Sequence, residues 1–181
     1  MLELPYDPAA LARKILENHF FSRDSTAVNL EYNDDIKAGC FVSLKKKADS
    51  SLRGCIGTTE PTRDSLAYEI AGNALAAALR DPRFPGLSPG ELTDIYITVD
   101  ILGEQQGVVD YDQLDPRKYG LVVVKGQRKG VLLPDLDGVE TVEKQLEIAG
   151  KKAGLSPEEI AKGDFNLYRF PVHRFKEQKD E

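Results

Sequence analysis

The chain has 181 residues, of which 41% are hydrophobic and 30% charged, a balance typical of a globular protein that buries a substantial core. Its 24 Lys and Arg against 30 Asp and Glu give a net charge of −6, which excludes a general electrostatic attraction to nucleic acid or anionic lipid. Two cysteines and two histidines, none of them clustered, are too few for a zinc site, so we expect no metal and no cofactor.

The sequence also indicates in which cellular compartment the protein is expected. The amino-terminal segment MLELPYDPAALARKIL carries acidic residues before its first basic one and lacks an uninterrupted apolar stretch, so we do not expect a secretory signal. No segment approaches the ~20 apolar residues of a membrane span. Two cysteines without a disulfide or metal-binding spacing fit a reducing compartment. We therefore predict a cytoplasmic protein without a membrane partner.

Helix and strand signals follow one another in the first third of the chain. Residues 8–20 are predicted to form a helix, with Asp7 as its cap and a proline at the first helical position. Strand-forming residues predict extended stretches at 27–32, 39–44 and 52–58. The last two are separated by a short polar connection, so we expect them to pair as a hairpin.

The middle of the chain combines the longest predicted helix with the clearest predicted strand. Thr62 is expected to cap an alanine-rich helix, which must end before Pro82 because the residue that precedes a proline is pushed out of the helical region. Residues 94–102, DIYITVDIL, alternate apolar and polar side chains. They are predicted to form a strand with one apolar and one polar face.

The last third is predicted to contain a second hairpin and two helices. Residues 119–124 and 130–133 are apolar runs joined by a glycine-containing turn. Apolar residues between positions 139 and 153 recur at helical spacing. Ser156 and Glu159 have the spacing of a capping box that opens a short helix.

A final strand is expected at residues 166–175, so strands outnumber helices and consecutive strands are hairpin-linked. This order predicts an α+β fold of antiparallel sheets with packed helices. The chain has no internal repeat, low-complexity tract or flexible linker. Residues 1–181 are therefore expected to form one domain, in which any second subdomain must be interleaved.

The stretch LRGCIGTT, residues 52–59, contains the most informative cysteine. In a strand, Arg53 and Cys55 would point to the same face, and a nearby guanidinium favours the thiolate and lowers a cysteine pKa from its free value of about 8.5. Gly54 and Gly57 would weaken a strand unless a ligand or another backbone comes close, and exposed amides beside a thiolate would suit an oxyanion. These features predict a reactive Cys55.

A structural role for the same cysteine is the alternative. Free cysteine is among the most buried residue types, and Cys40, flanked by Phe41 and Val42, is interpreted as structural. For Cys55 both interpretations stay open. The GxxG pattern around it lies in a predicted strand rather than between helices, and no Lys-Ser/Thr pair follows it. We therefore expect neither an RNA clamp nor a phosphate-binding loop.

A reactive thiol also needs polar partners. His173 is a candidate base only if the fold brings it close. Asp81 and Arg83 in the DPRF loop, Asp100 on the alternating strand, and Asp135 after a proline are further candidates. Each has a structural alternative, since these side chains could cap turns, pair with one another or face solvent.

Four stretches together resemble a known family: LRGCIGT, PTRDSLAYEIAGNALAAALRDPRF, ITVDIL, and LDPRKYGLVVVKGQRKGVLLPDLDGVETVEKQLEIAGKKAGL. Over about residues 8–175 the chain resembles the AMMECR family, in particular the members that form the A component of the AmmeMemoRadiSam system. RGCIG followed by DPRF at this distance is specific, unlike either piece alone.

This resemblance implies two subdomains of antiparallel sheet with packed helices, in a prokaryotic cytoplasmic protein often encoded beside a Memo-like protein and a radical SAM enzyme. The resemblance implies that residues 53–57 are the motif shared by the family, and that Asp81, Arg83 and Phe84 belong to its second shared stretch, DPRF. It implies no established reaction. Where many members read FLPQV, this chain reads LLPDL, so a carboxylate at Asp135 replaces an amide, changes the local charge and puts a pocket role for an amide there in doubt.

Two functions follow as hypotheses. In the first, the chain is an enzyme or a component of an enzyme system, with Cys55 as nucleophile or transient carrier and a small anionic substrate. Arg53 would be a thiolate stabiliser or an anion binder, and Arg83 a second anion contact. The residues expected to bind that substrate are Gly54, Gly57, Thr58, Asp81, Arg83 and Asp135. In the second, the chain is a non-catalytic adaptor for Memo-like or radical SAM proteins, with LRGCIG as a docking strand. Nucleic acid is not an expected partner.

Overall fold

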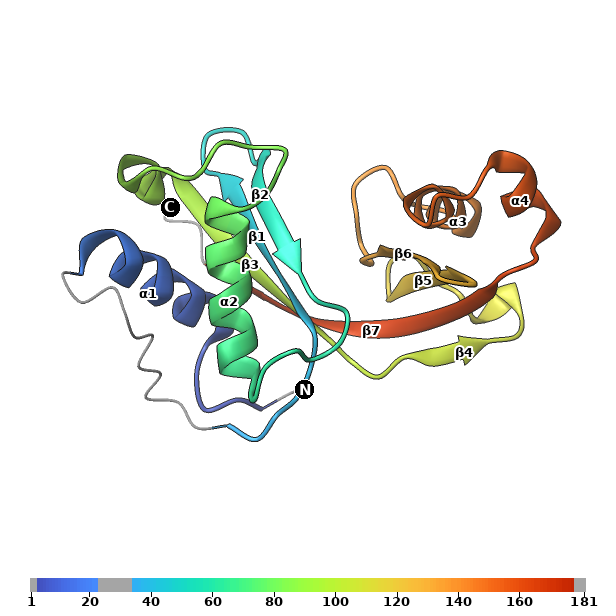
Figure 1. The fold of residues 1–181 in the computed structure, drawn as a ribbon, viewed down its shortest axis with the longest axis horizontal. Helices are drawn as coiled ribbons and strands as arrows, with labels where there is room; N and C mark the ends of the chain where they lie inside the picture. Colours follow the sequence, from blue (N-terminus) through green and yellow to red (C-terminus); the bar gives the residue numbers. More distant parts are fainter. Residues whose placement is uncertain (1–2, 23–33, 178–181) are drawn as a thin grey trace. The chain divides into compact units, whose positions relative to one another are not determined.

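The computed structural model describes residues 3–22 and 34–177 (Figure 1). The helices are α1 (Pro8–Phe21), α2 (Leu66–Leu79), α3 (Val142–Lys152) and α4 (Pro157–Lys162), and the strands are β1 (Cys40–Lys46), β2 (Leu52–Gly57), β3 (Ile95–Leu102), β4 (Gln106–Val108), β5 (Tyr119–Lys125), β6 (Arg128–Leu132) and β7 (Asn166–Lys176). Strand neighbours pair antiparallel, which confirms the predicted α+β class. The strand predicted at residues 27–32 lies outside the described residues.

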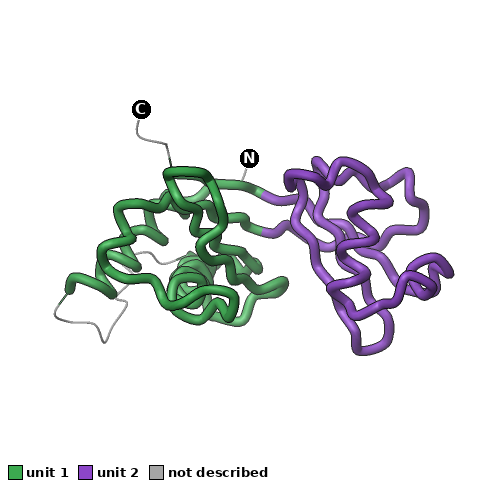
Figure 2. Tube along the Cα trace, turned by 90° about the horizontal axis from the view of Figure 1, so that it is seen from above, with its two compact units in different colours: residues 1–101, 173–181 green, residues 102–172 purple. Residues whose placement is uncertain are grey.

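The chain divides into two compact units (Figure 2). Unit 1 comprises Met1–Ile101 and His173–Glu181, and unit 2 comprises Leu102–Val172. Unit 2 is thus inserted into unit 1 along the sequence, and β7 contributes residues to both. That residues 1–181 form a single domain without a flexible linker stays a prediction.

In unit 1, β1 lies between β2 and β3, and α1 and α2 cover one face of these strands (Figure 1). Asp7 caps α1 as predicted, since its carboxylate accepts hydrogen bonds from the amides of Ala9 and Ala10. The core between helices and sheet is built from Leu16, Val42, Leu44, Ile70, Ala74, Ile97 and Val99, among others. Many alanines on α2 let the helix lie close to the sheet.

One prediction for unit 1 is wrong. Ser65, not Thr62, caps α2, and the Thr62 hydroxyl instead binds the carboxylate of Glu69. The strand β3 forms as predicted with an apolar and a polar face, but both faces are covered, because every residue from Ile95 to Leu102 is buried. Alternation in the sequence therefore separates apolar from polar side chains here, but not buried from exposed ones.

Unit 2 is built on the predicted second hairpin, β5 with β6, and β7 pairs with the other side of β5. The short strand β4, which the sequence did not reveal, pairs with β7. The helix α3 packs on β5 and β6 and begins later than expected, because Thr141 caps it. The capping box of Ser156 and Glu159 opens α4 as predicted. No helix among the described residues has the length and apolar character that a membrane crossing requires.

The glycines of β2 allow close packing. A Cβ at Gly54 would lie 2.2 Å from the carbonyl oxygen of Ala77, so the missing side chain lets α2 approach the strand. A Cβ at Gly57 would lie 2.3 Å from the ring of Phe41 on β1. Both glycines are therefore explained by neighbouring protein atoms rather than by a ligand.

We expect Gly54→Ala to lower the free energy of unfolding by about 2 kcal/mol, because the added methyl group forces α2 away from β2. Urea denaturation measures this difference. Gly90→Ala is the matched control, since a Cβ there has no heavy atom within 4 Å. Equal stability of the two variants would show that α2 can move outward at no cost.

Candidate functional site

The face of the unit 1 sheet that points away from α1 and α2 carries polar side chains. Ser43 on β1 lies opposite Cys55 on β2 and opposite Thr98 on β3, so these three residues form a row across the sheet. The Ser43 hydroxyl donates a hydrogen bond to Cys55 Sγ at 3.2 Å. Asp100 lies further along β3 and is 3% exposed. We call Ser43, Cys55, Thr98 and Asp100 the polar face.

The backbone of Cys55 is held by the DPRF loop. Its amide donates to the Asp81 carboxylate at 2.9 Å, and its carbonyl accepts from Arg83 Nη2 at 3.2 Å. Arg83 also donates to Asp81 through Nε at 2.9 Å and through Nη2 at 2.7 Å. The Arg83 guanidinium thereby holds the pKa of the Asp81 carboxyl well below its usual range.

This arrangement corrects the expectation of an oxyanion site at Cys55. The strand β2 ends the strand order of the sheet, so its outward backbone groups lack a neighbouring strand. Asp81 and Arg83 take the place of that strand at Cys55. Because the Cys55 amide already donates to a carboxylate, it is not available to an oxyanion.

Arg53 has a structural set of partners. Its Nε and Nη2 donate to the two carboxylate oxygens of Glu91 at 2.8 and 3.1 Å, and its Nη1 donates to the Pro85 carbonyl at 3.0 Å. The Arg53 side chain is buried, and its guanidinium lies 6.0 Å from the centre of the Phe84 ring. Arg83 lies 5.6 Å from the same ring. Phe84 therefore contacts the arginines of both motifs.

The pairing of β1 with β2 is irregular next to Arg53. Leu44 lies opposite Gly54 and Lys45 opposite Leu52, so Arg53 is an extra residue in β2. Simple alternation fails across such a bulge. The bulge and the ion pair with Glu91 explain why Arg53 acts on the 85–91 segment and forms no hydrogen bond with Cys55.

The direction of the Cys55 pKa shift is opposite to the sequence expectation. Burial raises the pKa of the thiol, and this effect exceeds the lowering by the Ser43 hydrogen bond and by the charge of Arg83. Asp100 and Asp81 raise the pKa further. Cys55 is therefore mostly a protonated thiol at neutral pH. The positive charge that favours its thiolate form is that of Arg83.

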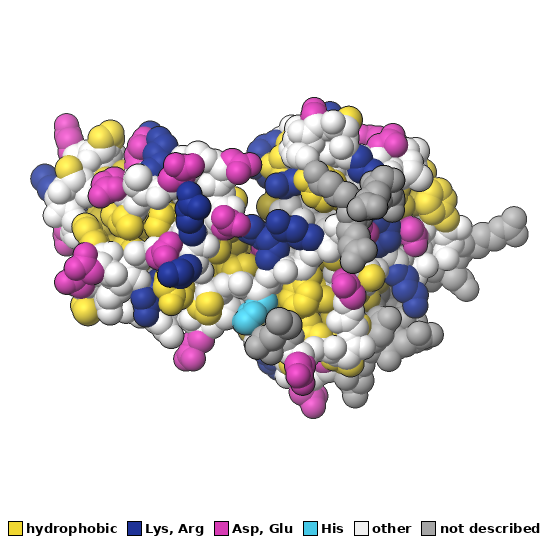
Figure 3. Space-filling model, turned by 180° about the vertical axis from the view of Figure 1, so that it is seen from behind, with side chains coloured by type: hydrophobic (Ala, Val, Ile, Leu, Met, Phe, Trp, Pro, Cys, Tyr) yellow, Lys and Arg dark blue, Asp and Glu magenta, His cyan; other side chains and the backbone are white. Residues whose placement is uncertain are grey.

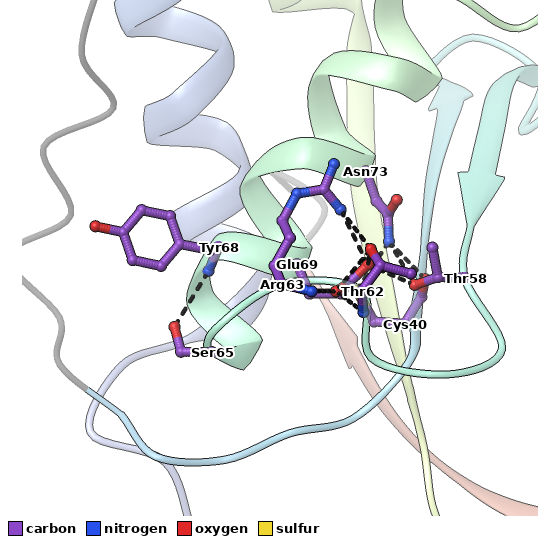
Figure 4. A network of polar contacts seen from close by, with 8 residues as sticks. All are labelled: Cys40, Thr58, Thr62, Arg63, Ser65, Tyr68, Glu69 and Asn73. Carbon is purple, nitrogen blue, oxygen red and sulfur yellow. Dashed lines mark hydrogen bonds and ion pairs between the residues drawn. The ribbon is translucent and has the colours of Figure 1, made fainter.

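Thr58 belongs to a separate network around Glu69 (Figure 4). The Glu69 carboxylate is fully buried and accepts hydrogen bonds from Thr58 Oγ1 at 2.7 Å, from the Thr62 amide at 2.7 Å and from Arg63 Nη1 at 3.0 Å. Burial acts to raise the pKa of Glu69, but these hydrogen bonds outweigh it and keep the pKa low. Thr58 thus fixes the segment that leads into α2.

Cys40 lies at the other end of this network. Asn73 donates to the Cys40 carbonyl at 2.9 Å and to its Sγ at 3.4 Å (Figure 4). Burial raises the pKa of Cys40 to about 12. A buried thiol of this kind is unreactive at neutral pH, as the structural interpretation of Cys40 requires.

The remaining candidate residues divide between the units. Asp100 accepts hydrogen bonds from Arg174 Nε at 2.6 Å and Nη2 at 3.2 Å. His173 precedes Arg174 on β7, so strand alternation directs it to the opposite face. Asp135 belongs to unit 2, where it has a left-handed backbone with φ of 55°. The structure does not assign it to the Cys55 site.

Sequence reasoning missed Ser43 and Glu91. Ser43 is polar between Val42 and Leu44, and the predicted hairpin offered a signal, but the register that places it opposite Cys55 was not known. Glu91 follows Arg53 by 38 positions, and no local pattern marks that pair. Within residues 3–22 and 34–177, no group of three or more His, Cys, Asp or Glu side chains could hold a metal ion.

Comparison with known protein families finds a match that covers most of this chain. The family model AMMECR1 matches residues 9–175, which include β2, the DPRF loop and the polar face. The chain belongs to the AMMECR1 family.

Relatives of this AMMECR1 chain occur in bacteria and archaea. It is 56% identical over 140 residues to a protein of Thermotoga maritima, covering 77% of this chain and 78% of the relative. It is 50% identical over 143 residues to a protein of Clostridium acetobutylicum, covering 79% of this chain but only 29% of that relative. The crystal structure of an uncharacterized protein from Pyrococcus horikoshii is similar with a TM-score of 0.83 at 26% identity, covering 94% of this chain and 90% of that one.

The ion pair of Arg53 and Glu91 makes stability depend on pH. The Arg53 guanidinium lowers the pKa of Glu91 from 4.5 to about 2, so the pair stabilises the fold above pH 4.5 and this contribution is lost as the pH falls towards 2. Because Glu91 is 40% exposed, we expect Glu91→Gln to cost only about 1 kcal/mol at pH 7.

Urea denaturation between pH 7 and pH 2 tests this dependence. The difference between wild type and Glu91→Gln should shrink as the pH falls below 4.5. Glu104→Gln, an exposed position, serves as control and should leave the pH profile unchanged. A difference that stays constant down to pH 2 would contradict the ion pair's role.

The shifted Cys55 pKa predicts slow alkylation. In a Cys40→Ala background, iodoacetamide should modify Cys55 at pH 7 about ten-fold more slowly than a model thiol, with a titration midpoint above that of the model thiol. Ser43→Ala and Arg83→Gln should each move this midpoint higher, because both groups favour the thiolate. Mass spectrometry of the modified chain measures the rates, and a midpoint below 8 would contradict the assignment.

Proposed function

We propose that this AMMECR1-family chain binds a small anionic substrate at Arg83, beside the thiol of Cys55, and acts as a cysteine-dependent component of an enzyme system. The observation that carries this proposal is the position of Arg83. Its side chain is 55% exposed although its ion-pair partner Asp81 is 2% exposed. A fixed and accessible guanidinium next to a thiol suits the recognition of a carboxylate or phosphate group.

The hydrogen bonds of Arg83 leave one edge of its guanidinium for a ligand. Nε donates to Asp81, and Nη2 donates to Asp81 and to the Cys55 carbonyl. Nη1 donates to no residue in the described part of the chain. Because two of the three nitrogens are held, little side-chain entropy would be lost when an anion binds to the third.

The environment of Cys55 restricts its chemistry. Its raised pKa means that the thiol has to lose its proton as it reacts, and Ser43 can stabilise the sulfur charge through its hydroxyl. Among the described residues, which include both histidines, the thiol is hydrogen-bonded by Ser43 and not by a histidine. We therefore propose that the substrate itself accepts the proton, and that its anionic group at Arg83 positions it to do so.

The charge balance favours a small ligand over a polyanion. Arg83 is paired with Asp81, and Arg174 with Asp100, so both of these arginines have a carboxylate partner. On the side of the molecule shown in Figure 3, Lys and Arg side chains lie among Asp, Glu and hydrophobic ones. This distribution supports a local contact with one anionic group rather than binding along a nucleic acid.

A second candidate function is an adaptor in the AmmeMemoRadiSam system, which binds a Memo-like or radical SAM protein in the cytoplasm. The relative from Clostridium acetobutylicum supports it, since this chain covers only 29% of that protein. The same domain is thus joined there to a longer polypeptide. In this function Cys55 and Arg83 would serve packing alone.

Cells that lack the gene test the two functions when complemented with wild type, Cys55→Ala or Arg83→Gln. We expect both variants to accumulate the same small acidic metabolite, at least about ten-fold above wild type, because both lose the same reaction step. Urea denaturation of each purified variant controls for folding, and Thr93→Ala, an exposed position, is the matched control.

A wild-type metabolite profile with Cys55→Ala would exclude the cysteine-dependent function. If that variant also co-purified with the partner proteins at the wild-type level, the adaptor function would be supported. Loss of function in Arg83→Gln alone would assign anion binding to Arg83 and leave Cys55 as a packing residue.

A further inference from the structure

We propose that a hollow beside the turn between β1 and β2 binds a small organic anion with an apolar body. The hollow has a volume of about 580 Å³, which falls within the range of small-molecule pockets. It lies entirely in unit 1, and Cys55 and Arg83 do not line it. The proposed site is therefore separate from the site at Cys55.

The lining of the hollow carries a net positive charge. It contains the cations Lys46, Lys47 and Arg53 and the anions Glu91 and Asp94, three against two, whereas the whole chain has a net charge of −6. Glu91 neutralises Arg53 through two hydrogen bonds. Lys46 and Lys47 then stand against Asp94, so the excess is one positive charge at the turn, where the sequence has the basic run 45–47.

The walls of the hollow are fixed by the backbone. The Lys47 amide donates to the Asp94 carbonyl at 2.8 Å, which ties the turn to the start of β3. The Lys46 amide donates to the Ser51 carbonyl at 2.9 Å, which closes the turn itself. A cavity with fixed walls loses little entropy when a ligand binds.

The floor of the hollow favours a ligand with an apolar part. Ile95 is buried there and Ala48 contributes a methyl group. The nitrogens of the Arg53 guanidinium all donate to Glu91, Pro85 or Gly86, so this charge is satisfied by the protein. An acidic group would bind the two lysines at the turn, while a ring or aliphatic body would cover the floor.

Phenyl phosphate is a suitable probe, because it joins one aromatic ring to one anionic group. In ¹⁵N-labelled protein we expect saturable shifts of the amides of Lys47, Ala48 and Asp94. Lys46→Gln and Lys47→Gln should each weaken binding about five-fold, the effect of one partly exposed charge. Lys45→Gln is the matched control, since strand alternation directs Lys45 to the other face of β1, and it should bind as wild type.

Two further probes separate the parts of the ligand. Inorganic phosphate carries the charge without the ring, and benzyl alcohol carries the ring without the charge, so both should bind at least about ten-fold more weakly than phenyl phosphate. Equal binding of inorganic phosphate would reduce the site to two surface charges and overturn the proposal. Absence of saturable shifts at the turn, or equal loss of affinity with Lys45→Gln, would also overturn it.

Discussion

The structure of unit 1 depends on how the outer edge of β2 is satisfied. An edge strand presents amide and carbonyl groups that need partners, and β2 lies at the end of its sheet. Asp81 and Arg83 supply those partners at Cys55, and Arg53 reaches across to Glu91. The segment that follows α2 is therefore bound to the strand through charged side chains rather than through a further strand.

This contact gives a physical reason for the joint occurrence of LRGCIG and DPRF. Gly54 lets α2 come close enough to place Asp81 beside Cys55, and the Phe84 ring lies near the guanidinium groups of both Arg53 and Arg83. Each motif would leave buried charged or polar groups unpaired without the other. Since unpaired buried charges are costly, the two stretches act as one structural unit.

The same contact determines what chemistry is left at the surface. The Cys55 amide and the whole of Arg53 are used by the fold, whereas the Arg83 side chain is half exposed beside the Cys55 thiol. Burial keeps the thiol protonated, so the site differs from one built around a free thiolate. Arg53 and Glu91 also line the hollow beside the turn that carries Lys46 and Lys47.

The sequence by itself determined much of the local structure of the described residues, although not the cap of α2 or the short strand β4. Asp7 and the capping box at Ser156 begin helices as predicted, and both hairpins form, because caps, turns and apolar periodicity act over a few residues. Only the tertiary structure decided the partners of Cys55 and Arg53. Asp81 is 26 positions from Cys55, and Glu91 is 38 positions from Arg53. A bulge and the ion pair with Glu91 redirect Arg53, and the thiol pKa follows from burial, which arises only when the chain is packed.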